Sequence, residues 1–361
     1  MGSKKNQQLT KLIRPEIQKM AAYHVPEAIG LVKLDAMENP FPWPEEMKAQ
    51  WLERLSRAEP NRYPDPSAKE LMTSLRDCFD VAPELGVVLG NGSDELIQLI
   101  LMAMNKDACV MAPTPSFVMY QHIANSLGLS FIGVPLNTDF SLDVPEMLAV
   151  IKEKNPAVIF LAYPNNPTGN LFDDADLLAI LEASNGLVVI DEAYQPFARK
   201  TFMDRAPDYE QLLVMRTVSK LGLAGLRLGF LVGHSNLTSQ FEKIRLPYNI
   251  NVFTQVTATF AFQHISTFDK QAKVICEQRE ILQSSLSSLK GVNVFPSDAN
   301  FILFSLQSDS AERVFEALKQ AGVLIKKMGN LPGLPAECLR VTVGTSSENK
   351  LFVEQITLIL K

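Results

Sequence analysis

The sequence predicts an α/β fold, with a large domain on a mainly parallel central sheet and a smaller α+β domain. Apolar runs that end in polar or turn residues recur at 86–93, 108–113, 157–167, 187–194 and 212–220. Segments with helical spacing of apolar residues lie between them, as at 94–105 and 174–184. Alternating strands and helices are typical of α/β folds, in which ligands bind outside the carboxyl ends of the strands. We therefore expect the strand ends to meet at one crevice.

The pattern changes after residue 260. A long charged helical stretch at 269–290 leads into strand candidates at 293–306 and 338–345, which is typical of a separate α+β unit. We therefore place the large domain at residues 41–262 and build the small domain from residues 1–40 and 263–361.

The composition favours a globular protein that acts on small molecules. The 361 residues are 47% hydrophobic and 20% charged, within the ordinary range for globular proteins. The net charge of −6 argues against nucleic-acid binding, because such proteins usually carry a basic patch. No apolar run is long enough to predict a membrane span, and the polar start MGSKKNQQLT lacks the apolar core of a secretory signal. We expect a cytoplasmic protein without nucleic-acid or membrane partners.

The cysteines and histidines do not predict a metal site. Cys78, Cys109, Cys276 and Cys338 include no closely spaced pair, and no two histidines are spaced i, i+4. We interpret the cysteines as buried, reduced thiols and the histidines as structural or surface residues.

Lys220 is the first candidate catalytic residue. It follows an apolar run and stands in a turn of small residues, RTVSKLGLAGLRLGF, which is an unusual setting for a charged group. Most lysines are exposed to solvent, so a surface lysine remains the more common interpretation of this position taken alone.

Asp191 changes that interpretation. It ends the apolar run LVVI and so puts a carboxylate on the side of the sheet where ligands bind. A lysine that forms a Schiff base and an acid that keeps the pyridine nitrogen protonated are the residues that pyridoxal 5′-phosphate (PLP) requires. A helix-capping role is the alternative for Asp191. The pair indicates PLP as the cofactor, with Lys220 and Asp191 as catalytic residues.

The loop YPNNPTGN at 163–170 follows another apolar run and is stiffened by two prolines and a glycine. Such a loop can direct the amide of Asn166 toward the phenolic oxygen of the cofactor, and Tyr194 can donate a second hydrogen bond there, which makes Tyr194 a third catalytic candidate. A plain Asn-Pro turn is the alternative for this motif.

A phosphate site is predicted at the start of the helical segment 94–105. Gly90, Gly92, Ser93 and Asp94 form a glycine-rich turn whose free backbone N–H groups and helix dipole favour an anion. Ser93 is also a good N-cap, which is the alternative for this turn and can hold at the same time. The residues that flank Lys220 and complete the phosphate site are Thr217, Ser219 and Arg227.

These residues resemble the fold-type I PLP-dependent aminotransferases, and most closely the histidinol-phosphate aminotransferases. The resemblance covers nearly the whole chain, with the motifs in the family's order. YPNNPTGN, VVIDEAYQPF and RTVSKLGLAGLRLGF are shared across the superfamily, whereas DAMENP, RYPDP and LPYNIN point to the narrower group.

The resemblance implies further cofactor contacts. It implies that Phe117 stacks on the cofactor ring and that Tyr63 reaches the cofactor phosphate of the neighbouring subunit, so that the protein is a homodimer. The sequence departs from the family in two places. Six residues separate Lys220 from Arg227, one fewer than in many members, and Phe117 has no hydroxyl group.

The resemblance also implies the substrate contacts. Arg340 would pair with the carboxylate of glutamate and with the phosphate of the other substrate, because a guanidinium fork suits both anions. A surface position is the alternative for Arg340. Tyr23, Asn39 and Asn166 are implied as further substrate contacts, with Tyr248 or Asn251 as candidate partners.

The implied reaction is PLP-dependent transfer of an amino group between L-histidinol phosphate and 2-oxoglutarate, as in histidine biosynthesis. Two alternatives use nearly the same residues: an aminotransferase for aromatic amino acids and a decarboxylase for threonine phosphate. A third is a PLP-binding regulator or an inactive scaffold, against which the complete set of Lys220, Asp191, Asn166 and Tyr194 argues.

Overall fold

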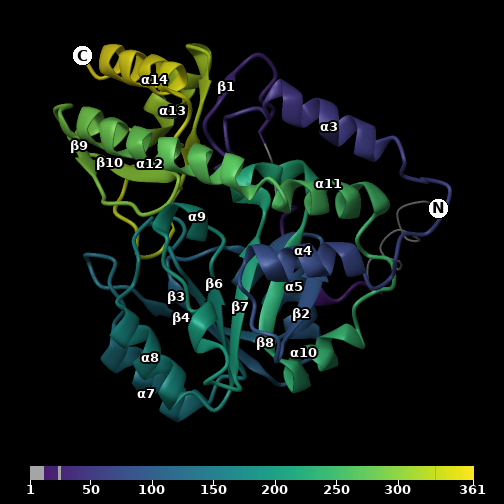
Figure 1. Ribbon diagram of the computed structural model, residues 1–361. Helices are drawn as coiled ribbons and strands as arrows, with labels where there is room; N and C mark the ends of the chain where they lie inside the picture. Colours follow the sequence, from purple (N-terminus) through teal and green to yellow (C-terminus); the bar gives the residue numbers. More distant parts are fainter. Residues whose placement is uncertain (1–11, 23–25, 330) are drawn as a thin grey trace, which may run out of the picture.

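The computed structural model describes residues 12–22, 26–329 and 331–361. Its largest sheet has seven strands in the order β2-β8-β7-β6-β5-β3-β4 (Figure 1). Their bounds are β2 (Leu85–Gly90), β3 (Cys109–Thr114), β4 (Ser130–Pro135), β5 (Val158–Ala162), β6 (Leu187–Asp191), β7 (Leu212–Thr217) and β8 (Gly229–His234). Strand β8 runs antiparallel to β2 and β7 on its two sides, and the other neighbouring pairs of this sheet are parallel. The predicted mainly parallel sheet is therefore confirmed.

The five predicted apolar runs are strands β2, β3, β5, β6 and β7, whereas β4 and β8 were not predicted. The sequence of β4, SFIGVP, lies at the sheet edge and buries only Val134, so it has no continuous apolar run. The sequence of β8 begins and nearly ends in glycine. A Cβ atom at Gly233 would lie 2.6 Å from the side chain of Leu213, so only glycine lets β8 approach β7 this closely.

Helices cover both faces of this sheet. One face packs against α5 (Gly92–Met102), α6 (Met119–Leu127) and α10 (Ser235–Glu242). The other packs against α4 (Lys69–Cys78), α7 (Val144–Lys154), α8 (Asp174–Ala183) and α11 (Val252–Phe262). Successive strand residues such as Val87 and Val88 contribute to opposite cores. This two-sided burial explains why the strands read as continuous apolar runs rather than alternating ones.

A second unit contains a four-stranded antiparallel sheet in the order β12-β13-β10-β9. Its strands are β9 (Val292–Val294), β10 (Phe301–Leu306), β12 (Lys326–Lys327) and β13 (Cys338–Thr342), and β1 (Val32–Lys33) pairs with β11 (Val323–Leu324). Its helices are α12 (Ile265–Ser287), α13 (Ala311–Gln320) and α14 (Ser346–Ile359). The segment 293–306 is therefore two strands rather than one, because the hydroxyl of Ser297 closes a turn by donating to the carbonyl of Phe301 at 2.6 Å.

This second unit has its own apolar core, which includes Leu34, Phe304 and Phe352 together with Tyr194 and Phe197 from beyond β6. A core separate from the two that cover the faces of the large sheet is consistent with the expected two domains. The boundaries at 41–262, 1–40 and 263–361 stay a prediction.

The remaining helices are α2 (Pro15–Lys19), α3 (Glu45–Leu55) and α9 (Gln195–Ala198), with 3-10 turns at Met203–Arg205 and Ala224–Leu226 and a π-helical turn at Ser219–Leu223. The ring of Trp43, just before α3, lies 5.4 Å from Trp51, 6.0 Å from Phe260 and 5.8 Å from Phe268. These aromatic contacts hold α3 against α11 and α12.

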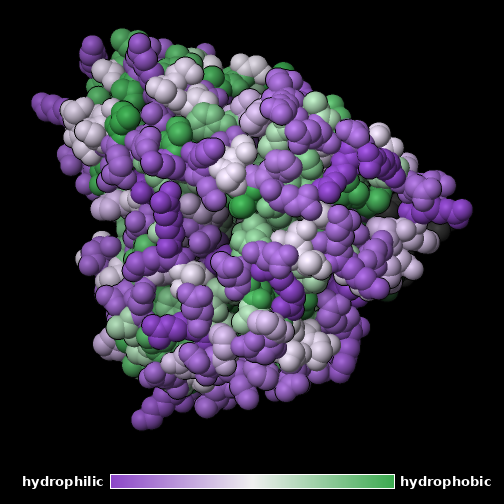
Figure 2. Space-filling model, in the orientation of Figure 1, coloured by the Kyte–Doolittle hydropathy of each residue, from purple (hydrophilic) through white to green (hydrophobic). Residues whose placement is uncertain are grey.

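The surface in Figure 2 is mostly hydrophilic, with hydrophobic residues in separate small areas. Within the described parts of the chain, no helix combines the length and the apolar character needed to cross a membrane.

Candidate active site

A cleft lies at the carboxyl ends of the parallel strands. It is lined by Met37, Ser93, Asp94, Phe117, Ala162, Pro164, Asn166, Asp191, Ala193, Tyr194, Thr217, Ser219, Lys220 and Arg227. All of them except Met37 end or follow β2, β3, β5, β6 and β7, so the five predicted strand ends do meet at one crevice.

Lys220 lies in the π-helical turn that follows β7, with its side chain half-buried. Its Nζ atom donates a hydrogen bond to the carbonyl oxygen of Ala36 at 2.9 Å and lies 6.0 Å from the centre of the Tyr194 ring. Burial, helped by the positive charge of Arg340, lowers the pKa of Lys220 to about 8. Such an amine loses its proton near neutral pH and can then act as a nucleophile or a base.

Asp191, at the end of β6, is 4% exposed. Burial raises the pKa of Asp191 to about 6, although two hydrogen bonds oppose this shift. The hydroxyl of Tyr120 donates to Oδ2 at 2.6 Å, and the backbone N–H of Ala193 donates to Oδ1 at 3.1 Å. The Tyr120 ring is itself buried and stacks on Phe160 at 4.6 Å. These two hydrogen bonds therefore fix the orientation of the Asp191 carboxylate.

A buried ion pair lies next to Asp191. The Glu192 carboxylate accepts hydrogen bonds from Arg216 on β7 at 2.8 Å, from the hydroxyl of Thr201 and from the backbone N–H of Phe202 at 2.6 Å. Burial raises the pKa of Glu192, while the charge of Arg216 opposes that rise. The pair ties the end of β6 to the end of β7, which are the two strands that carry Asp191 and Lys220.

Asn166 connects two other predicted residues. Its Nδ2 atom donates to the hydroxyl of Tyr194 at 3.2 Å, and its Oδ1 atom accepts a hydrogen bond from Arg340 at 2.6 Å. Arg340, on β13, also donates to the carbonyl of Asp35 at 3.2 Å and lies over the ring of Phe301. It is 6% exposed, so it is not a surface residue of the strand.

The predicted anion end of the cleft lies at the start of α5. Gly92 has a φ of +79°, and a Cβ atom there would lie 2.8 Å from the guanidinium group of Arg227. Arg227 lies 3.5 Å from the hydroxyl of Ser219 and 3.4 Å from Asp94, despite its shorter spacing from Lys220. The hydroxyl of Thr217 donates to that of Ser219 at 2.9 Å. Hydroxyl, guanidinium and helix N–H donors thus converge, which suits a phosphate group.

The other predicted residues lie differently. Phe117 lines the cleft, with its ring edge-on to Tyr120 at 5.5 Å. Asn39 does not line it, because its amide donates at 2.9 Å to the carbonyl of Leu221 and to Gln271. Its contact with Leu221 supports the turn that carries Lys220.

Among the described residues, Tyr63, Tyr248 and Asn251 also lie outside the lining of the cleft. Tyr63 is 80% exposed and stacks on Tyr248 at 4.5 Å. Asn251 caps α11 by accepting a hydrogen bond from the backbone N–H of Thr254 at 2.9 Å. Tyr23 lies outside the described residues.

The cysteines are free thiols, but only Cys338 is buried, and Cys78, Cys109 and Cys276 are half-buried. Our expectation of buried thiols was therefore wrong for three of the four. Across the described ranges, no group of three or more His, Cys, Asp or Glu residues is arranged to hold a metal ion.

Two contributors to the cleft were missed from the sequence. Tyr120, in the first turn of α6, contributes through its hydrogen bond to Asp191, and its position three residues after Phe117 is the one signal that could have found it. Met37 lines the cleft with a φ of +54° and donates its backbone N–H to the hydroxyl of Thr342 at 2.9 Å. This contact joins residues far apart in the chain, so no local pattern predicts it.

The comparisons with known proteins agree with this geometry. The family model for aminotransferase class I and II matches residues 29–356. The chain therefore belongs to the class I and II aminotransferases.

Histidinol-phosphate aminotransferase 2 of Nitrosococcus oceani is 54% identical, over 95% of this chain and 96% of the relative. Histidinol-phosphate aminotransferase 1 of Ralstonia nicotianae is 49% identical, over 96% and 94%. The crystal structure of histidinol-phosphate aminotransferase from Sinorhizobium meliloti in complex with PLP superposes with a TM-score of 0.86 at 22% identity, covering 96% and 97% of the two chains. That structural likeness shows the fold.

Family membership confirms the resemblance to fold-type I PLP-dependent aminotransferases. The predicted fold class, enzyme class and PLP cofactor are confirmed with it.

The raised pKa of Asp191 makes a prediction about stability. Because the folded-state value of about 6 exceeds the ordinary 3.8, this group's contribution to folding is complete below about pH 3.8 and is lost as the pH rises through 6. In cofactor-free protein, Asp191→Asn removes the buried charge and should raise the free energy of unfolding near pH 7.5 by about 1–3 kcal/mol.

Denaturant unfolding of the cofactor-free protein between about pH 4 and pH 8 measures this effect. The difference between wild type and Asp191→Asn should shrink toward pH 4, while the exposed control Asp107→Asn should show no such pH dependence. A gain that is constant across this range would contradict the assignment to Asp191.

Proposed function

We propose that the protein is a cytoplasmic homodimer that transfers an amino group between L-histidinol phosphate and 2-oxoglutarate. The observation that carries the proposal is one cleft that holds a lysine with a lowered pKa and an aspartate with a raised pKa, between two groups of hydrogen-bond donors. The substrate is supported by two relatives at 54% and 49% identity, both named histidinol-phosphate aminotransferases.

The residues of the cleft fit PLP. Asp191 would pair with the ring nitrogen, Asn166 and Tyr194 would donate to the phenolic oxygen, and Phe117 would cover the ring. The phosphate would be held by Ser93, Thr217, Ser219 and Arg227 and by the backbone N–H groups of Gly92 and Asp94 at the start of α5. Bound there, PLP supplies an electron-withdrawing ring that stabilises negative charge on the substrate carbon bearing the amino group.

Lys220 is the base of the proposed reaction. Its Nζ atom removes the proton from the substrate carbon that carries the amino group, and in the reverse direction it returns a proton there. With a pKa of about 8, both forms of the amine are present near neutral pH. In balance, L-histidinol phosphate and 2-oxoglutarate give imidazole-acetol phosphate and glutamate.

Arg340 is proposed to bind the anionic group of each substrate. Its hydrogen bond to Asn166 puts the guanidinium next to the residue that would contact the cofactor. A guanidinium group can donate paired hydrogen bonds to either a carboxylate or a phosphate. Tyr23 and Asn39 are proposed as additional contacts, with Asn39 acting beside the turn of Lys220.

The homodimer is supported by an exposed aromatic surface. Tyr63 and Tyr248 are 80% and 40% exposed, although they stack on each other, and Leu246 and Phe253 are exposed nearby in sequence to Tyr248. Exposed apolar groups of this kind are typical of protein interfaces. Tyr63 would then contact the cofactor phosphate in the partner subunit's cleft.

The test of this function is an amino-transfer assay on purified enzyme loaded with PLP. L-Histidinol phosphate and 2-oxoglutarate should be consumed in equal amounts as glutamate forms, and Lys220→Ala should abolish turnover while PLP still binds. If phenylalanine and tyrosine were turned over as well as L-histidinol phosphate, the protein would instead be an aminotransferase for aromatic amino acids. If it released carbon dioxide from threonine phosphate, it would instead be a decarboxylase. Full activity of Lys220→Ala would refute the role of Lys220.

Arg340→Lys tests the shared anion contact. The lysine keeps the charge but loses the fork, and a charged hydrogen bond contributes about 1.5–3 kcal/mol. Both half-reactions should therefore slow by about one to two powers of ten in kcat/KM. The exposed Arg313→Lys on α13 is the control. If only one half-reaction changed, Arg340 would not serve both substrates.

A mixed dimer tests the proposed contribution of Tyr63. Combining Tyr63→Phe subunits with Lys220→Ala subunits gives heterodimers in which one site carries both changes and the other carries neither. At limiting PLP, the mixture should be more active after subunit exchange than the average of the two parents. Activity that stays at the average of the parents, or a fully active monomer in sedimentation, would contradict a shared site.

A further inference from the structure

The linker between α10 and α11 presents three consecutive exposed residues, Leu246, Pro247 and Tyr248. Tyr248 adopts a φ of +59°, which is uncommon for a residue with a bulky side chain. The residues on either side, Arg245 and Asn249, are partly buried. The exposed part of the linker is therefore held by its two ends.

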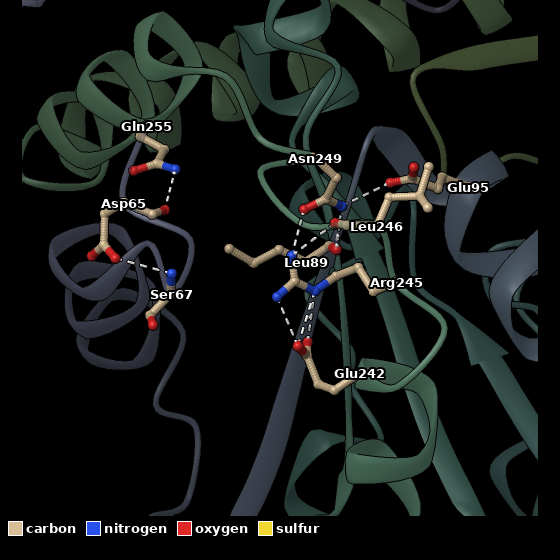
Figure 3. A network of polar contacts seen from close by, with 9 residues as sticks. All are labelled: Asp65, Ser67, Leu89, Glu95, Glu242, Arg245, Leu246, Asn249 and Gln255. Carbon is tan, nitrogen blue, oxygen red and sulfur yellow. Dashed lines mark hydrogen bonds and ion pairs between the residues drawn. The ribbon is translucent and has the colours of Figure 1, made fainter. Parts of the chain in front are cut away.

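Asn249 is the more strongly bonded end. Its Nδ2 atom donates at 3.0 Å to the carbonyl of Leu89 on β2 and at 3.0 Å to Glu95, and its Oδ1 atom accepts from Arg245 at 2.7 Å. Its backbone carbonyl accepts from the side chain of Asn91 at 2.8 Å. Figure 3 shows the Asn249 side chain between Glu95 on one side and Arg245 on the other.

Glu95 holds the other side of this connection. One oxygen, Oε2, accepts from Asn249 at 3.0 Å and from the backbone N–H of Asn91 at 2.6 Å. Asn91 is the residue that precedes α5, and Gly92, Ser93 and Asp94 follow it directly. The same carboxylate therefore fixes both the turn proposed to bind the cofactor phosphate and the linker that carries Tyr248.

A second contact connects this region to the segment of Tyr63. The side chain of Gln255, in the first turn of α11, donates to the carbonyl of Asp65 at 2.9 Å (Figure 3). The ring of Tyr63 then stacks on Tyr248 at 4.5 Å with an angle of 20° between the planes. The orientation of Tyr63 thus depends on Tyr248, and that of Tyr248 depends on its bonded neighbour Asn249.

We propose that Glu95 and Asn249 are positioning residues that couple the phosphate-binding turn of one subunit to the Tyr63–Tyr248 pair that serves the other. The proposal rests on the proposed function, which assigns that turn and Tyr63 to the two cofactor phosphates of a dimer. Such coupling is reciprocal: PLP bound in one subunit orders the surface that completes the partner's site, and dimer formation strengthens PLP binding.

The test uses the full-length protein with PLP removed. Titration with PLP gives the dissociation constant of the cofactor, and sedimentation gives that of the dimer. Glu95→Ala and Asn249→Ala should each raise both constants about tenfold, since each loses hydrogen bonds in a partly buried network. Glu95→Gln keeps an oxygen acceptor on a side chain of the same length, so both dissociation constants should stay close to those of the wild type. The control is Gln98→Ala, exposed on the same helix.

The double variant separates coupling from general weakening. If both residues act through one connection, the double variant Glu95→Ala with Asn249→Ala should have the same two dissociation constants as the more impaired single variant. Additive losses would overturn the proposal. A change in PLP affinity without a change in dimer affinity would also overturn it, because the hydrogen bonds would then support only the phosphate-binding turn.

Wild-type protein provides a measurement that does not depend on whether the variants fold. Addition of PLP to the cofactor-free dimer should slow amide hydrogen exchange in residues 243–251, and unchanged exchange there would refute the coupling. Absence of PLP binding or of amino transfer by the wild type would instead refute the proposed function, so the two failures are distinguishable.

Discussion

The burial of a carboxylate and an amine in one cleft is the constraint on which much of this structure depends. A charged group taken from water is costly unless neighbouring groups compensate it. The hydroxyl of Tyr120 and the N–H of Ala193 compensate Asp191, and the carbonyl of Ala36 receives the amine of Lys220. The ion pair of Glu192 and Arg216 fixes the adjacent strand ends. The compensation is incomplete, so both pKa values remain shifted toward neutrality. This incomplete compensation is what gives the two groups their chemistry.

The parts that could be predicted from the sequence are those with a local cause. Strands buried on both faces produce continuous apolar runs, so β2, β3, β5, β6 and β7 were predictable, and the residues that end them could be assigned to one crevice. The edge strand β4 and the glycine-containing β8 lack that signal. Lys220 and Asp191 were found because charged residues that end apolar runs are unusual.

The connections between these residues had no local signal. Tyr120 reaches Asp191 across 71 positions, Arg340 reaches Asn166 across 174, and Asn249 reaches Glu95 across 154. Tyrosine, arginine and asparagine have many ordinary roles, so their identity alone does not reveal a partner. A family resemblance supplied Arg340 but not the hydrogen bond to Asn166. The sequence thus indicates which groups are present, whereas the fold determines which of them act together.

Arg340 comes from β13 of the small sheet, whereas Ser93, Asp191, Thr217 and Lys220 follow strands of the large one. The groups proposed for substrate recognition and for cofactor chemistry are thus encoded in separate stretches of the chain and stabilised by separate cores. Arg340 is the link between the two parts, because its guanidinium contacts Asn166 and its charge helps to lower the pKa of Lys220. Outside Arg340, the small sheet is therefore the part to randomise when a new amino acceptor is sought, because its other residues lie apart from the strand ends that carry the reactive groups.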